Sequence, residues 1–210
     1  EVTPCHRYPQ HVTRPSRWTG LSRADRQAER RHLLVRAAFE LFGEDGESAV
    51  TVRSVCRQAE LNNRYFYENF TDTDELLGAV YDFVVADLIA ALTAAMSDLP
   101  DDRARLRAGI STVLDFSSRD PSRGKILFTE ARTNPVLAAR RSATQEMLRR
   151  SVLGGRGAAS GARPIAGLVS AAMYSGSMAE LAQEWLSGTL GTDLEPVVES
   201  AVRLLMPVAD

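Results

Sequence analysis

The residues of this sequence best suited to specific chemistry form a short polar stretch at positions 62–69, which reads NNRYFYEN. An asparagine side chain can make paired hydrogen bonds with the edge of adenine, and an arginine can do the same with guanine. Tyrosine hydroxyls suit phosphate oxygens. The stretch therefore favours a surface that reads DNA over an ordinary solvated helix. The residues expected to face outward and contact DNA are Asn62, Asn63, Arg64, Tyr65, Tyr67 and Asn69.

Two short helices joined by a tight turn must position this polar stretch. Thr51 is a good N-cap for the first helix, the chain turns at Glu60, and Asn62 can cap the second helix. Such a pair can place its second helix in a major groove. The range 51–70 is therefore predicted to be a helix-turn-helix, in which Thr51 and Arg53 are further DNA contacts. The apolar residues expected to face inward are Val52, Val55, Cys56, Ala59, Phe66 and Phe70.

The rest of the chain also shows helical spacing of its apolar residues, and no segment alternates convincingly with the period of a strand. The sequence predicts an all-α fold. Helices are expected at 23–43, 51–58, 62–69, 72–98, 102–118, 121–132, 135–153, 164–188 and 193–206. Gly43 and Gly46 are expected to end the first helix. The glycine-rich range 154–164 is expected to be a flexible loop.

Composition describes a soluble protein of 210 residues with a net charge of −2. The range 1–31 is locally basic, with seven arginines against three acidic residues, and local charge matters more for phosphate contact than the total does. Three prolines lie within 1–22, which is expected to form an irregular basic arm. Such an arm either stays disordered or enters a minor groove through Arg14 and Arg17.

Residues from about 30 to 80 resemble the DNA-binding domain of TetR-type (tetracycline repressor) regulators. The matching segments are AAFELFGEDG, TVRSVCRQAEL, RYFYENF and DELLGAV. Tyr67 and Phe70 match the Tyr-x-x-Phe that ends the family's recognition helix. Leu76 and Leu77 match the leucine pair that opens its long fourth helix.

Three positions depart from the family pattern. Glu60 stands where the family usually has glycine in the turn, and Arg64 stands at a position usually held by a small residue. The range 71–74 reads TDTD where a phosphate-contacting lysine is usual. Asp72 and Asp74 suit a helix N-terminus but do not help to hold a phosphate. Arg53, Arg57, Arg64 or the basic arm would then have to contact the phosphates.

The resemblance implies an N-terminal three-helix domain with a helix-turn-helix and a C-terminal helical bundle for ligand binding and dimerisation. The corresponding ranges are 1–22 for the arm, 23–89 for the DNA-binding domain and 90–210 for the bundle. Helices 164–188 and 193–206 would form the homodimer interface. The expected function is a ligand-responsive repressor that binds a palindromic operator and is released by a small-molecule effector. The helix 72–98 would couple the two domains.

An effector cavity between the C-terminal helices is also implied by the resemblance. The candidate lining residues are Phe83, Phe116, Phe128, Met147, Met173, Tyr174, Glu180 and Trp185. Most of them are core residues in any helical bundle. Glu180 and Glu184 stand one turn apart and could receive a cationic ligand, although an ordinary solvated face is the more common use of such a pair.

Two other classes of protein remain open. The acidic range 71–74 leaves room for a helical small-molecule-binding protein that has lost DNA binding. An enzyme is disfavoured because no nucleophile with a histidine partner, metal cluster or phosphate loop is visible. No cofactor and no metal are expected. Two cysteines without metal spacing, and no stretch of about 18 apolar residues, favour a cytoplasmic protein without a membrane partner.

Overall fold

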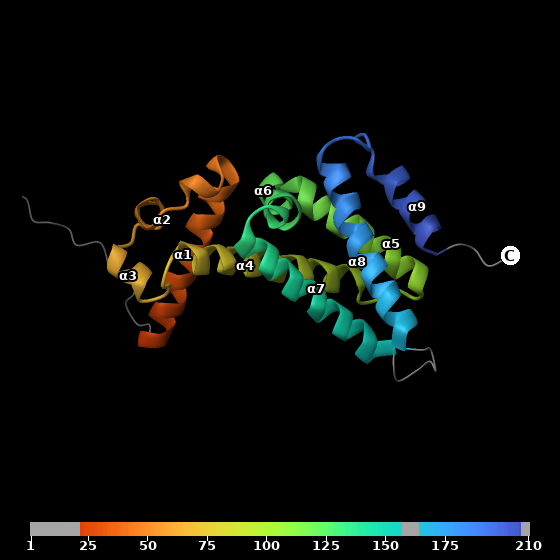
Figure 1. Cartoon of the computed structure of the whole chain (residues 1–210), viewed down its shortest axis with the longest axis horizontal. Coiled ribbons are helices and arrows are strands. Elements are labelled where there is room, and N and C mark those ends of the chain that lie inside the picture. Colours follow the sequence, from red (N-terminus) through yellow and green to blue (C-terminus); the bar gives the residue numbers. More distant parts are fainter. Residues whose placement is uncertain (1–21, 157–163, 207–210) are drawn as a thin grey trace, which may run out of the picture.

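The computed structural model describes residues 22–156 and 164–206, and this part of the chain consists of helices and their connections, without a strand (Figure 1). The all-α prediction is confirmed. The α-helices are α1 (Arg23–Asp45), α2 (Val52–Gln58), α3 (Asn63–Tyr67), α4 (Thr73–Met96), α5 (Asp102–Arg119), α6 (Pro121–Gly124), α7 (Pro135–Arg156), α8 (Pro164–Leu186) and α9 (Leu194–Leu205). A 3₁₀ turn, η1 (Glu47–Ala49), follows α1, and a π-helical turn, η2 (Lys125–Thr129), and a 3₁₀ turn, η3 (Glu130–Arg132), follow α6.

Polar N-caps explain where several of these helices begin. Ser22 and Asp25 form a capping box at the start of α1. The Asp101 carboxylate accepts a hydrogen bond from the backbone N–H of Ala104 at 2.7 Å. Each cap satisfies a backbone donor that has no partner within its own helix.

Helix α4 connects the two ends of the molecule (Figure 1). Helices α1, α2 and α3 gather at one end, and α5, α8 and α9 lie toward the other. Within the described part of the chain, α4 is long and apolar enough by composition to span a membrane, with a mean hydropathy of 1.8 over its most apolar window. It packs against α1, α5 and α7, so these contacts account for its apolar character as a core helix.

Two clusters of buried side chains form the core. The first joins α1, α2, α3 and α4 to parts of α5, η2 and α7, and its fully buried members include Leu34, Phe42, Phe66 and Leu76. The second lies among α5, α8 and α9. Its members are Ile110, Val113, Leu114, Met178, Ala182, Val198, Ala201 and Val202. Phe128 packs against both clusters, so the two ends of the molecule are continuous through their cores.

Three sequence predictions about these elements need correction. Helix α1 continues past Gly43 and ends at Asp45, before Gly46 with its φ of 80°. Gly43 is needed for packing, because a Cβ there would overlap the Ser122 side chain. The single helix expected at 121–132 is divided into α6, η2 and η3. The expected loop begins later, since 154–156 belong to α7. The basic arm and most of that loop lie outside the described residues.

Candidate DNA-binding surface

Helix α2 is fixed by a capping box at its N-terminus. The Thr51 hydroxyl accepts a hydrogen bond from Ser54 N–H at 3.1 Å, and the Ser54 hydroxyl accepts one from Thr51 N–H at 3.0 Å. Val55, Cys56 and Ala59 are buried, as the spacing predicts. Burial raises the pKa of the Cys56 thiol, which keeps it protonated and unreactive near neutral pH.

The turn after α2 has the hydrogen bonds of a Schellman motif. Leu61 N–H donates to the Cys56 carbonyl at 2.9 Å, and Glu60 N–H donates to the Arg57 carbonyl at 3.2 Å. This motif requires a left-handed residue at its centre, and Glu60 has a φ of 55°. Glycine adopts that conformation without steric cost, whereas for glutamate the Cβ makes it costly. The departure noticed at position 60 therefore falls at a strained backbone position.

Helix α3 presents the predicted polar face, although the helix is shorter than the expected range of 62–69. The Asn62 side chain caps it by accepting a hydrogen bond from Arg64 N–H at 2.9 Å. Phe66 and Phe70 are 0% and 2% exposed and anchor α3 to the first core cluster. Asn62, Asn63, Arg64 and Tyr67 are exposed, with Tyr67 64% exposed, so these residues face solvent as predicted.

Two of the six residues expected to face outward are instead half-buried. The Tyr65 ring lies under the Arg30 guanidinium, 3.9 Å from its centroid. The Asn69 side chain donates to the Tyr65 carbonyl at 2.7 Å. Tyr65 and Asn69 therefore face outward less fully than predicted, because Arg30 of α1 covers Tyr65 and Asn69 bonds back to the Tyr65 carbonyl.

Helix α1 holds α3 through contacts that sequence reasoning missed. Arg31 Nη1 donates to the Asn69 carbonyl at 2.8 Å, and its guanidinium lies 4.2 Å from the centroid of Phe70. Gln27 Nε2 donates to the Glu68 carbonyl at 3.3 Å. These donors bind the carbonyls of the two residues that directly follow α3. The sequence shows only that the N-terminal half of α1 is basic, which does not reveal these partners.

The acidic segment that replaces the usual lysine caps α4. The Asp72 carboxylate accepts a hydrogen bond from Glu75 N–H at 2.8 Å. The Glu75 carboxylate accepts from both the backbone N–H and the hydroxyl of Thr71, and these hydrogen bonds lower the pKa of Glu75. The expectation that Asp72 suits a helix N-terminus is confirmed. Positive charge on the helix-turn-helix comes from Arg53, Arg57 and Arg64, whose side chains are exposed.

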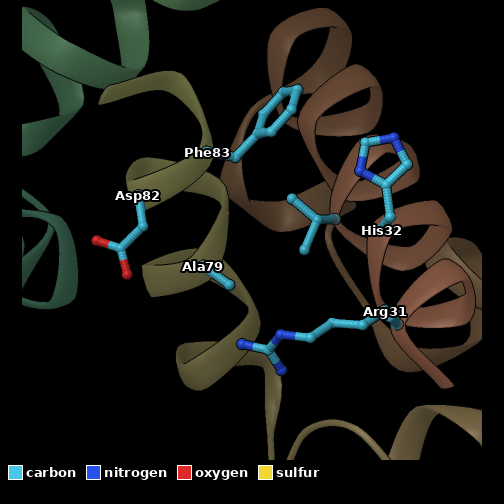
Figure 2. A pocket seen from close by; sticks show the side chains of 7 residues that line it. Arg31, His32, Ala79, Asp82 and Phe83 are labelled. Carbon is cyan, nitrogen blue, oxygen red and sulfur yellow. The ribbon is translucent and has the colours of Figure 1, made fainter. Parts of the chain in front are cut away.

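A shallow pocket of about 410 Å³ separates the N-terminal half of α1 from α4 (Figure 2). Phe83, which was expected to line an effector cavity, lies here. Its ring meets His32 and Phe39 edge to face, at centroid distances of 6.0 and 6.1 Å. Asp82 points away from α1, and its carboxylate accepts a hydrogen bond from Arg140 of α7 at 2.8 Å. Phe83 thus contributes to packing between α1 and α4.

The other candidate effector residues are dispersed. Phe116 is buried beneath Arg123, with the guanidinium 4.4 Å from the ring centroid. Met147 and Met173 are 48% and 66% exposed. The Tyr174 hydroxyl lies close to Gly109 of α5.

Glu180 and Trp185 have contrasting surroundings on α8. The Glu180 carboxylate accepts a hydrogen bond from Arg132 at 2.6 Å, so it already has a cationic partner. Trp185 packs against the second core cluster, and its indole N–H is buried without a hydrogen-bond partner. Buried donors normally have a partner, so Trp185 is the candidate whose environment most needs explanation.

Helices α2 and α3 have the arrangement of a helix-turn-helix, and the helices after α4 form a bundle. Residues 34–80 match the family model described as bacterial regulatory proteins, tetR family. The chain is 29% identical to the HTH-type transcriptional activator FasR of Mycolicibacterium smegmatis over 182 residues, covering 83% of this chain and 80% of that protein.

Solved structures share the fold. The fatty acid degradation regulator FadR of Bacillus halodurans matches with a TM-score of 0.66 and 15% identity, covering 85% of this chain and 95% of that one. FadR of Bacillus subtilis, solved in complex with stearoyl-CoA, matches with a TM-score of 0.67 and 17% identity, covering 85% and 99%. The match to the family model over residues 34–80 agrees with the resemblance that the sequence predicts.

Proposed function

We propose that this chain is a ligand-responsive repressor that binds a palindromic operator as a homodimer. The observation that carries the proposal is the exposed face of α3, on which Asn63, Arg64 and Tyr67 project from a helix held by α1. Because α3 is already held against α1, less conformational entropy is lost when it binds DNA. Bidentate contacts from such residues to base edges would each contribute about 1–3 kcal/mol of discrimination.

Exposed apolar side chains on α8 and α9 support dimerisation. On the described surface they include Val169 and Met173 of α8, Leu204 and Leu205 of α9, and Met206 directly after α9, and Leu204 is 82% exposed. Where exposed apolar side chains come together in one patch, they mark a protein interface. A two-fold dimer would present two copies of α3 to half-sites about 34–36 Å apart.

The effector that we propose places an apolar chain and one hydrogen-bond acceptor against the second core cluster. The second core cluster is almost wholly aliphatic, and the unpartnered indole N–H of Trp185 at its edge would donate to that acceptor. A long-chain acyl thioester has this chemistry, and stearoyl-CoA is the first probe to use. Trp185→Phe keeps a similar apolar volume and removes the donor. Weaker stearoyl-CoA binding in this variant, measured by calorimetry, supports the assignment, whereas unchanged affinity contradicts it.

Coupling between effector and DNA would pass through α4. On this helix, Asp82 is paired with Arg140 of α7. Leu88, also on α4, packs against both core clusters. Displacement of α7 or α8 by an effector would therefore change the position of α4 and the spacing of the two reading helices. A coupling free energy of about 1–3 kcal/mol is sufficient. We place the protein in the cytoplasm, with DNA.

We propose repression, in which the bound protein blocks transcription and its release from the operator by the effector allows it. A reporter driven by the operator tests this: deletion of the gene for this chain should raise expression. Lower expression would make the protein an activator, which is the description given to the FasR relative.

Arg64→Ala tests the reading surface, with Arg119→Ala as a matched control. Arg64 and Arg119 are 82% and 78% exposed, and each donates from Nε to a carboxylate one helical turn away, at 2.9 and 2.8 Å. Operators are first selected by the wild-type protein from a random duplex library. We expect Arg64→Ala to bind the operator more weakly and less selectively, while Arg119→Ala binds as the wild type does. Unchanged selectivity would exclude Arg64 from base reading. If the wild type binds no duplex at low salt, the alternative of a small-molecule binder without DNA binding is supported.

A further inference from the structure

Glu68 is the single acidic residue between Leu61 and Phe70, and it lies at the C-terminal end of the reading helix. Its carboxylate is placed between two arginines. Oε1 accepts a hydrogen bond from Arg64 Nε at 2.9 Å, and Oε2 lies 3.5 Å from Arg30 Nη1. The side chain of Glu68 is 36% exposed, and that of Arg64 is 82% exposed. The carboxylate therefore offsets positive charge on the surface that faces DNA.

The position of Glu68 is set by the protein backbone and does not depend on the ion pairs alone. Its N–H donates to the Arg64 carbonyl at 3.0 Å, and its carbonyl accepts from Gln27 of α1 at 3.3 Å. These contacts hold the backbone of Glu68 one helical turn from Arg64. Any phosphate that approaches Arg64 must compete with a carboxylate already in place.

We propose that Glu68 is a specificity-determining residue that withholds Arg64 from the phosphates of unrelated DNA. The proposal rests on the DNA-binding function proposed above. A single phosphate that binds Arg64 only takes the place of the Glu68 carboxylate, so the exchange of one anion for another adds little binding free energy. A guanine edge offers two aligned acceptors to the guanidinium, and this bidentate contact compensates for loss of the ion pair. Arg64 therefore leaves Glu68 at an operator and stays with it elsewhere.

The test compares Glu68→Gln with Glu60→Gln in the full-length chain. Both substitutions remove one negative charge from the helix-turn-helix, but Glu60 makes no ion pair among the described residues. Affinity for the selected operator and for a shuffled duplex is measured by fluorescence anisotropy over a series of salt concentrations. The effect of lost charge alone is then given by Glu60→Gln.

We expect Glu68→Gln to bind the shuffled duplex about two- to five-fold more tightly than Glu60→Gln does, the range that corresponds to an exposed ion pair. Its dependence of log K on log salt for that duplex should steepen by about 0.9, because one more phosphate is neutralised. The slope for the operator should not change. Placing Glu68→Gln in an Arg64→Ala background should abolish the difference.

Two results would overturn the proposal. If Glu68→Gln matches Glu60→Gln on both duplexes, Glu68 has no masking role. If Glu68→Gln loses operator affinity while shuffled binding is unchanged, the carboxylate contacts the operator directly or only supports α3. Circular dichroism and thermal unfolding of each variant separate a direct contact from a folding defect. Failure of the wild type to bind either duplex would instead reject the DNA-binding function itself.

Discussion

Glycine at position 60 should stabilise this protein. Glu60 occupies the left-handed position of the Schellman motif after α2, with a φ of 55°. The left-handed conformation costs a residue with a Cβ about 1–2 kcal/mol. Glycine avoids that cost but loses about 0.5–1 kcal/mol more backbone entropy on folding. The net gain expected for Glu60→Gly is about 0.5–1 kcal/mol.

Thermal unfolding of the purified protein measures this gain, with Glu60→Ala as the control. Alanine removes the carboxylate but keeps the Cβ that causes the strain, so it separates backbone relief from loss of charge. A gain of about 1 kcal/mol raises the melting temperature by about 2–4 °C in a chain of this length. We expect Glu60→Gly to melt above both the wild type and Glu60→Ala. Equal melting temperatures for Glu60→Gly and Glu60→Ala would refute the assignment of strain to this residue.

Three further predictions follow from the site. Asp72→Ala removes the N-cap of α4 and should cost about 1 kcal/mol of unfolding free energy in urea titrations, without a fall in operator affinity; a fall would make Asp72 a DNA contact. Arg31→Ala removes the donor to the Asn69 carbonyl and should cost about 1 kcal/mol and weaken operator binding, whereas unchanged stability and binding would show that this contact does not hold α3. Burial raises the pKa of Cys56, so the stabilisation from its protonated thiol is fully present below the pKa of the thiol in the unfolded chain and is lost as pH rises through its pKa in the folded protein. Urea titrations of the wild type and Cys56→Ala across that range should show this difference, and parallel curves would contradict it.

Local features of the fold were predictable because their causes lie within a few residues of each other. Thr51, Asn62 and Asp72 cap the helices at which their types placed them. Phe66 and Phe70 are buried because their spacing puts both on one face. Capping and amphipathic periodicity depend on neighbours along the chain, so the sequence carries that information directly.

The contacts that were missed depend on residues far apart in the chain. Arg31 holds Asn69 across 38 positions, and Arg132 pairs with Glu180 across 48. A charged residue has the same appearance in a sequence whether its partner is solvent or another helix. The burial of Tyr65 has the same origin, because Arg30 of α1 covers it. The π-helical turn at Lys125–Thr129 has apolar spacing like that of an ordinary α-helix, so the sequence does not predict the departure from α-helical geometry there.

The salt dependence of DNA binding tests the central claim most directly. Neutralisation of phosphates by arginines of the helix-turn-helix releases counterions, so log K for the operator should fall linearly and steeply with log salt. The measurement uses the wild-type chain, a selected operator and fluorescence anisotropy. A steep linear fall, with weaker binding to shuffled DNA at every salt concentration, is the result that we predict. A flat response would contradict the assignment of α3 and its surrounding arginines as a DNA-binding surface.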